Sequence, residues 1–308
     1  MSSGLRDYGF TAMGSPGLIR LYSPERRQAD AAAAAAMNEI ARIENRYSRF
    51  LPDSVLSGLN RVGRAGGAIE VDAETAGIVD YAFSCHRKSG GLFDITAGCL
   101  RQAWDFSVPR LPDRRTVEEL LRRVGLDKLD WRSPRLTFTQ PGMELDFGGI
   151  CKEYAVDRAA ETCLSHGLDH GLIDLGGDIR VLGPQADGAP WPIGVRHPRM
   201  PGSLAASLML GGGGMATSGD YERFIEVDGT RYCHILDPRS GWPISGLSSV
   251  TVLAGSCLLA GSVATIAMLK GRDGADWLRG LNVTHLWIDA EGRQGGNVPP
   301  PEGATPGY

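Results

Sequence analysis

The chain has 308 residues, of which 42% are hydrophobic and 22% charged, a composition typical of a folded globular protein with one large domain or two modest ones. Its net charge of −4 excludes the strongly basic surface that nucleic acids or anionic membranes attract. Residues 1–20 lack a signal-peptide pattern, and no stretch approaches the roughly 20 apolar residues of a membrane span, so we expect a cytoplasmic protein. The six cysteines are scattered singly and are expected to be free, mostly buried thiols.

In chain order, the first half is predicted to begin with one strand, which is followed by helices whose ends carry capping residues. Ser23-Pro24-Glu25 predicts a helix start, with Ser23 as N-cap and Pro24 at the first helical position. Asp72 and Gly90-Gly91 are a predicted cap and stop of a second helix. The predicted elements are a strand over 17–22, a long helix through the alanine-rich run 29–37, a helix over 73–89, and a helix from a capping box at 116–119 to Gly125.

The central segment, 144–183, predicts strand, glycine turn, helix, strand, glycine turn and strand. Leu145 and Phe147 alternate with Asp146, and Gly148-Gly149 then permits close approach of the backbone. Lys152 falls in the first turn of a helix expected over 152–166, where backbone N–H groups favour an anion. The segment indicates either a site for a phosphate-bearing ligand or a βαβ-type unit whose glycines only form turns.

The second half is rich in strands, and the mixture predicts one α+β domain over 1–295 with mixed or antiparallel sheets and flanking helices. Residues 296–308 are rich in Pro and Gly and predict a tail. The expected elements are strands over 191–195, 205–210, 223–227, 232–236, 249–254 and 285–288, and helices over 259–269 and 275–279.

His234 lies where a predicted strand enters the turn His-Ile-Leu-Asp-Pro-Arg-Ser-Gly-Trp-Pro. An ordinary histidine pKa near ~6.5 suits proton transfer at neutral pH, and a structural role is the alternative. The run Gly211–Gly214 is no Walker loop because no Gly-Lys-Ser/Thr follows it, and Gly176-Gly177-Asp178-Ile179 lacks the spacing of a dinucleotide fingerprint. No GxSxG elbow or zinc spacing occurs.

The order of several motifs resembles the FAD:protein FMN transferase family (the ApbE type). The specific motifs are DFGGICKEYAVD and HILDPRSGWP, joined by weaker ones such as ENRYSRF, FDITAGCL and SGDYER, over roughly Phe10 to Gly271. The resemblance implies an ApbE-like, T-fold-like architecture. It also implies an enzyme that binds FAD with a divalent cation, usually Mg²⁺, moves the FMN half onto a Ser or Thr of a target flavoprotein, and releases AMP.

The same resemblance implies roles for individual residues. The Gly149 carbonyl and the Thr265 hydroxyl match metal ligands, and His234 matches the group that takes the proton of the acceptor hydroxyl. The residues that match FAD contacts are Met13, Phe50, Leu92, Phe93, Asp94, Asp146, Lys152 and Leu236.

The sequence departs from the family pattern at one metal ligand. Where the family has Ala-Asp-x-x-x-Thr, Gly261 replaces the aspartate, and Glu153 stands where the family has glycine in Lys-Gly-Tyr. Loss of one such electrostatic group costs about 10²–10³ in rate. Three alternatives follow. Another acid replaces the missing ligand, with Glu153, Asp178 and Asp237 as candidates, or FAD phosphates, Thr265 and water hold the metal weakly. In the third alternative, the protein binds flavin without transferring it. A Gly261→Asp variant is expected to separate them by its gain in rate.

Overall fold

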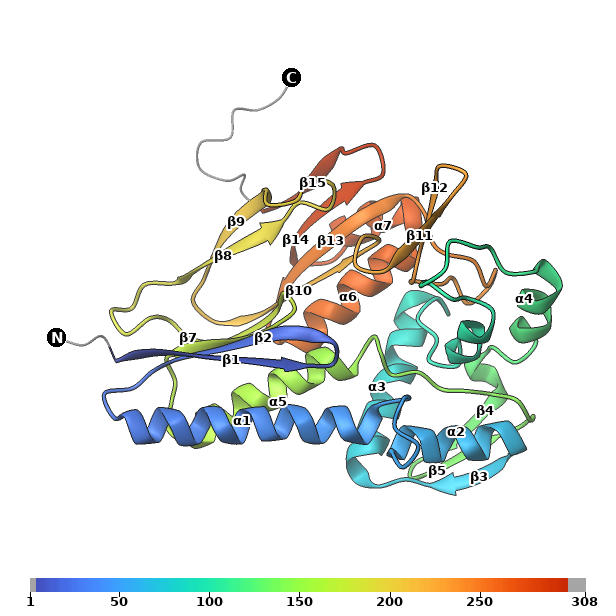
Figure 1. Ribbon diagram of the computed structural model, residues 1–308, viewed down its shortest axis with the longest axis horizontal. Helices are drawn as coiled ribbons and strands as arrows, with labels where there is room; N and C mark the ends of the chain where they lie inside the picture. The colour runs from blue at the N-terminus through green and yellow to red at the C-terminus, as the bar shows by residue number, and fades with distance from the viewer. Residues whose placement is uncertain (1–3, 299–308) are drawn as a thin grey trace.

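The computed structural model describes residues 4–298 and shows a single α+β domain built on an eight-stranded antiparallel sheet (Figure 1). The expected fold class is therefore confirmed. The predicted tail lies outside the described residues from 299 onward. The sheet contains, in spatial order, β1 (Leu5–Ala12), β2 (Ser15–Tyr22), β6 (Gly171–Leu175), β7 (Asp178–Gly183), β10 (Gly213–Gly219), β13 (Leu247–Ala254), β14 (Thr284–Asp289) and β15 (Gln294–Gly296).

Helices and three small antiparallel units complete the domain. The helices are α1 (Arg26–Tyr47), α2 (Val55–Ala65), α3 (Ala73–Ser89), α4 (Arg114–Leu121), α5 (Cys151–Ser165), α6 (Cys257–Leu269) and α7 (Gly274–Arg279). The small units are β3 (Gly67–Glu70), β5 (Arg135–Phe138) and β4 (Leu129–Arg132); β8 (Trp191–Arg196) and β9 (Leu204–Leu210); and β11 (Phe224–Val227) and β12 (Thr230–Cys233). Short 3₁₀ turns cover Gly98–Gln102, Leu126–Lys128 and Gly271–Asp273.

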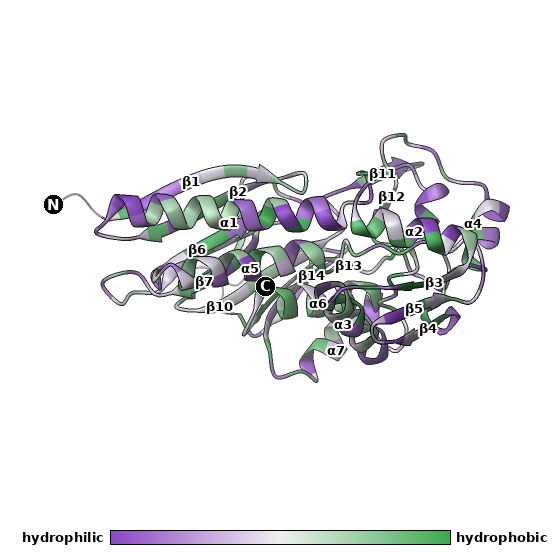
Figure 2. Cartoon of the chain, turned by 90° about the horizontal axis from the view of Figure 1, so that it is seen from below, coloured by the Kyte–Doolittle hydropathy of each residue, from purple (hydrophilic) through white to green (hydrophobic). Residues whose placement is uncertain are grey.

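Helices α1, α5 and α6 cover one face of the sheet, and α1 and α5 run side by side (Figure 2). The alanine-rich run explains this close packing, since the buried face of α1 begins with Ala29, Ala32, Ala33 and Ala36. Small side chains at helical spacing let two helix backbones approach closely. Residues of β6 point alternately to the two faces: Ile173 packs with the helices, and Leu172 packs with the β8–β9 ribbon.

Most predicted elements form, but two helix starts differ. The helix over 73–89 has the expected Asp72 cap and Gly90 end. Helix α1 starts at Arg26 with Glu25 as N-cap, because the Ser23 hydroxyl instead accepts a hydrogen bond from the Glu25 N–H. Helix α4 starts at Arg114 and ends at Leu121, because Asp113 and not Thr116 is its N-cap. The strand expected over 232–236 ends at Cys233, as β12. The elements that were not predicted are helix α2 and strands β1, β3, β4, β5, β10 and β15.

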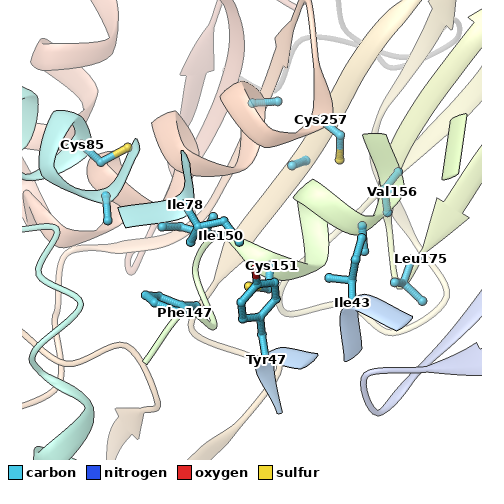
Figure 3. Close-up of a cluster of buried hydrophobic side chains, with 14 of the residues drawn as sticks. Ile43, Tyr47, Ile78, Cys85, Phe147, Ile150, Cys151, Val156, Leu175 and Cys257 are labelled. Atoms are coloured by element: carbon cyan, nitrogen blue, oxygen red, sulfur yellow. The ribbon is translucent and has the colours of Figure 1, made fainter. Parts of the chain in front are cut away.

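The strand expected at Leu145–Phe147 is wrong: the segment is an extended loop with a single bridge at Glu144. Both apolar side chains are buried, as the alternation indicated. The Phe147 ring packs edge-to-face on Tyr47 with centroids 5.8 Å apart, beside Ile150 and Cys151 (Figure 3). The core therefore anchors the loop without help from a neighbouring strand.

All six cysteines are free and buried, as expected. Within residues 4–298, no helix combines the length and apolarity needed to cross a membrane.

Candidate active site

The loop that carries Asp146 is held by hydrogen bonds on both sides. The Asn60 side chain accepts a hydrogen bond from the Leu145 N–H at 2.7 Å and donates one to the Leu145 carbonyl at 3.0 Å. The Asp146 N–H donates to the Ile95 carbonyl at 2.8 Å, and the Gly148 N–H donates to the Asp146 carboxylate at 2.7 Å. These bonds fix the direction of the Asp146 side chain.

The Asp146 carboxylate pairs with two arginines that are distant in sequence. Arg49 and Arg101 each place a guanidinium nitrogen 2.7 Å from Oδ2. Burial favours the neutral acid, but the positive charges of Arg101 and Arg49 outweigh it and hold the pKa of Asp146 below its ordinary value. Asp146 is therefore ionised at neutral pH and orients both guanidinium groups. The motif containing Phe50 included Arg49 without indicating this role, and nothing in the sequence singled out Arg101.

Two adjoining cavities meet at this ion pair. The larger, of about 1340 Å³, is lined by arginines and aromatic side chains together with four acids, Asp105, Glu144, Asp146 and Glu222, and the smaller measures about 140 Å³. Gly98, Arg101, Asp146 and His234 line both cavities. The arginines and aromatic residues of the larger cavity are Arg49, Arg61, Arg64, Arg101, Arg223, Phe50, Trp104, Phe106 and Phe224. Such a lining suits a ligand that combines a planar ring with negative charge.

The structure brings most of the predicted site residues to these cavities. Phe50 lies at the larger one with 77% of its surface exposed, and the Arg49 guanidinium stacks 4.6 Å from its ring centre. The predicted residues along the smaller cavity are Leu92, Phe93, Asp94, Asp146, Gly149, His234, Leu236 and Thr265. Asp94 uses both carboxylate oxygens for hydrogen bonds to Thr96 and Leu126, so its side chain shapes the loop that carries Phe93.

Met13 and Lys152 line neither cavity. Met13 adopts a positive φ of 52° in the β1–β2 turn, and its N–H donates to Glu44 at 2.7 Å. The Lys152 ammonium lies 2.8 Å from the Asp178 carboxylate, beside the Gly176-Gly177 turn. Burial favours the neutral amine, but the carboxylates of Asp178 and Glu153 outweigh it and raise the pKa of Lys152. Lys152 is thus a permanent cation between the two glycine turns.

His234 projects its ring into the region that the cavities share. Its Nδ1 lies 3.2 Å from the Arg223 carbonyl, which only accepts, so Nδ1 carries the proton and Nε2 is the free basic nitrogen. Burial and, to a smaller extent, the charges of Arg101 and Arg223 outweigh the opposing hydrogen bond and together lower the pKa of His234 from 6.5 to about 4. The ring is therefore neutral at pH 7, although its ligand-free pKa lies below the ordinary value expected from sequence.

Oxygen donors suitable for a hard cation gather beside Thr265. An added Cβ at Gly149 would lie 4.0 Å from the Thr265 methyl carbon, and the Thr265 hydroxyl hydrogen-bonds to Ser218 at 2.8 Å. Between residues 4 and 298, no three His, Cys, Asp or Glu side chains gather into a metal-binding group. Within the described residues, the buried oxygen Glu153 Oε2 nevertheless lacks a hydrogen-bond partner, and Asp178 Oδ2 is held only by its ion pair with Lys152. Hydroxyl, carbonyl and carboxylate oxygens are the ligands that Mg²⁺ prefers, so the donor set fits that ion.

The chain resembles known proteins in sequence and in fold. The family model described as "ApbE family" matches residues 13–287. A curated relative from Haemophilus influenzae, named FAD:protein FMN transferase, is 32% identical over 244 residues, covering 76% of this chain and 70% of the relative. The crystal structure of the ApbE protein from Thermotoga maritima is 30% identical, with a TM-score of 0.87 over 95% of this chain and 97% of that one. The flavin transferase ApbE from Vibrio cholerae is 26% identical, with a TM-score of 0.85 over 96% and 97%.

Proposed function

The chain belongs to the ApbE family, and we propose that it is an FAD:protein FMN transferase. In this proposal it moves the FMN half of FAD onto a Ser or Thr hydroxyl of a target flavoprotein and releases AMP. The observation that carries the proposal is the position of a neutral His234 at the junction of two cavities, beside Arg101 and the Asp146 loop. A free imidazole nitrogen facing a cationic, aromatic cleft supports attack by a hydroxyl on a bound phosphate ester.

The bonds formed and broken in this reaction balance, and the proton has an acceptor. The acceptor hydroxyl oxygen forms a bond to the phosphorus of the FMN half, and the bond from that phosphorus to the AMP oxygen breaks. Nε2 of His234 takes the hydroxyl proton. Arg101 and Arg49, both held by Asp146, offset negative charge on the phosphate oxygens.

Binding of FAD also changes the pKa of the proposed base, His234. The charges of Arg101 and Arg223 help to lower the pKa of His234 in the free protein. A bound pyrophosphate neutralises those charges, so the pKa of His234 rises when substrate binds. The histidine thus becomes a better proton acceptor only in the loaded enzyme.

Mg²⁺ in this proposal is held by the Gly149 carbonyl and the Thr265 hydroxyl. When bound, the ion supplies positive charge that neutralises the pyrophosphate. Lys152 adds a fixed positive charge beside the Gly176-Gly177 turn.

The test is incubation of the protein with FAD, Mg²⁺ and a flavoprotein domain that carries a Ser or Thr flavinylation site. A denaturing gel is then read for covalent flavin fluorescence. A fluorescent acceptor band is expected with wild type and with His166→Ala, which changes an exposed histidine at the end of α5. The band is expected to vanish with His234→Ala. A protein that binds FAD tightly and yet labels no acceptor in a panel of such domains would be a flavin-binding homologue and not a transferase.

A further inference from the structure

Glu153 is a buried acid with one carboxyl oxygen that no group in the described part of the chain contacts by a hydrogen bond. The residue is only 6% exposed, and its Oε2 has no hydrogen-bond partner in the described part of the chain. A buried carboxylate oxygen without a partner is strongly destabilised unless an ion or a water molecule contacts it. The side chain therefore indicates a ligand at this position.

The contacts of Glu153 place its carboxylate next to Thr265. A Cβ added at Gly261 would lie 2.6 Å from both Cγ and Oε1 of Glu153, so this side chain fills the space that glycine leaves on α6. Gly261 and Thr265 are four residues apart on α6, and residues at this spacing lie on the same helix face, with Cβ positions about 5–6 Å apart. The carboxylate consequently lies one helical turn from the Thr265 hydroxyl.

A second buried acid, Asp178, lies close to Glu153 and takes up the nearby lysine. Asp178 is 2% exposed, and one of its oxygens accepts a hydrogen bond from the Thr217 N–H at 3.3 Å. Its other oxygen lies 2.8 Å from the Lys152 ammonium and forms an ion pair with it. Lys152 is thus paired with Asp178, and the buried Glu153 Oε2 is left without a partner among the described residues. A free carboxylate oxygen of this kind suits a divalent cation.

We propose that Glu153 is the carboxylate ligand of the Mg²⁺ site, reaching from α5 into the space beside Gly261 and completing a donor set with Thr265 and Gly149. The inference rests on the proposed function for the presence of the ion. It selects Glu153 from the three candidate acids and places the ligand on α5, whereas the family pattern has its aspartate at the position of Gly261 on α6. Asp237 does not compete for this role, because its carboxylate already accepts hydrogen bonds from Arg239 and Ser240 within its own turn.

The same contact changes what a Gly261→Asp variant does. The single substitution introduces a Cβ 2.6 Å from Glu153 and a second carboxylate in the same buried space. It is expected to impair the protein and not to raise its rate. The double variant Glu153→Gly/Gly261→Asp removes the obstruction and returns one carboxylate to the site from α6.

The test uses Mn²⁺ as a probe, because it prefers the same octahedral oxygen ligands as Mg²⁺. Mn²⁺ is titrated into the full-length protein with FAD present, and free Mn²⁺ is measured by electron paramagnetic resonance. We expect Glu153→Gln to weaken Mn²⁺ binding about tenfold or more, with FAD affinity measured separately by flavin fluorescence. Glu161→Gln, an exposed acid on the same helix, is the matched control and leaves Mn²⁺ binding unchanged.

The double variant keeps the test decisive if Glu153→Gln is poorly folded. Mn²⁺ binding by Glu153→Gly/Gly261→Asp at least as tight as in Glu161→Gln supports the assignment, whereas binding as weak as in Glu153→Gly alone contradicts it. Unchanged Mn²⁺ affinity in a folded Glu153→Gln protein overturns it and makes Glu153 a neutral filler of the core. The two proposals fail separately. Glu153-dependent Mn²⁺ binding without FMN transfer removes only the transferase, and FMN transfer with an unaltered metal requirement in Glu153→Gln removes only this ligand assignment.

Discussion

Replacement of Asn60 by alanine tests whether the clamp on the Asp146 loop positions the site. Asn60 is 6% exposed and makes two hydrogen bonds to the backbone of Leu145, at 2.7 and 3.0 Å. Alanine leaves a buried N–H and a buried carbonyl without partners, and each such group costs about 1–3 kcal/mol. The expected loss in the free energy of unfolding is therefore about 2–6 kcal/mol, measured by urea denaturation.

Asn297→Ala is the matched control. The Asn297 amide makes the same pair of bonds to backbone, accepting from the His285 N–H at 2.7 Å and donating to the Val283 carbonyl at 3.2 Å. It is exposed and lies next to β15, so water replaces its bonds and the expected loss is about 1 kcal/mol.

The affinity for FAD is expected to distinguish Asn60→Ala from Asn297→Ala further. Asn60→Ala frees the loop whose Asp146 holds Arg49 and Arg101, so FAD affinity is expected to fall, whereas Asn297→Ala keeps wild-type affinity. Flavin fluorescence titration measures both. A loss below about 1 kcal/mol with unchanged FAD affinity in Asn60→Ala, or an equal loss of affinity in Asn297→Ala, would refute the reasoning.

Three further outcomes are expected. The pKa of His234 is lowered from 6.5 to about 4 in the folded protein, so the unfolded chain takes up the proton first as pH falls. Wild type should therefore lose stability relative to His234→Ala between pH 6.5 and 4, measured by urea unfolding. An equal change of unfolding free energy with pH in both proteins would contradict this. Trp104→Ala removes a 4% exposed ring that stacks on Phe106 and donates a hydrogen bond to the Gly241 carbonyl at 2.8 Å. We expect a loss of about 3–5 kcal/mol in unfolding free energy, and a near-neutral effect would show that this ring does not contribute to the core. Chelation with EDTA should stop labelling of the acceptor, and added Mg²⁺ should restore it; labelling that persists in EDTA would exclude a metal requirement.

Several local features could be predicted because they depend on neighbouring residues. Asp72 caps α3 by accepting from the N–H groups of Glu74 and Thr75, and Gly90 ends the same helix with a φ of 70°. The start predicted from the capping box at 116–119 was wrong. Asp113 caps α4, because its carboxylate accepts the hydrogen bond from the Thr116 N–H.

The loop at Leu145–Phe147 shows why an alternating pattern is not always a strand. Its apolar side chains are buried, as in a strand, but its backbone groups bond to Asn60 and Ile95 and not to a regular neighbouring strand. Alternation reports which side chains are buried and says nothing about the partner of the backbone. The two partners lie 51 and 85 residues away along the chain, which no local window contains.

The sequence by itself determined the α+β class, the helix ends with strong caps, and the family, since the motifs that carry the family occur in order along one chain. Tertiary structure decided how the site works, because charge and space there are shared between distant segments. Asp146 meets Arg49 from 97 residues away, and Glu153 fills the space at Gly261 on another helix. The pKa of His234 likewise depends on its burial and on Arg101. Burial, charge neighbours and free volume exist only once the chain is folded.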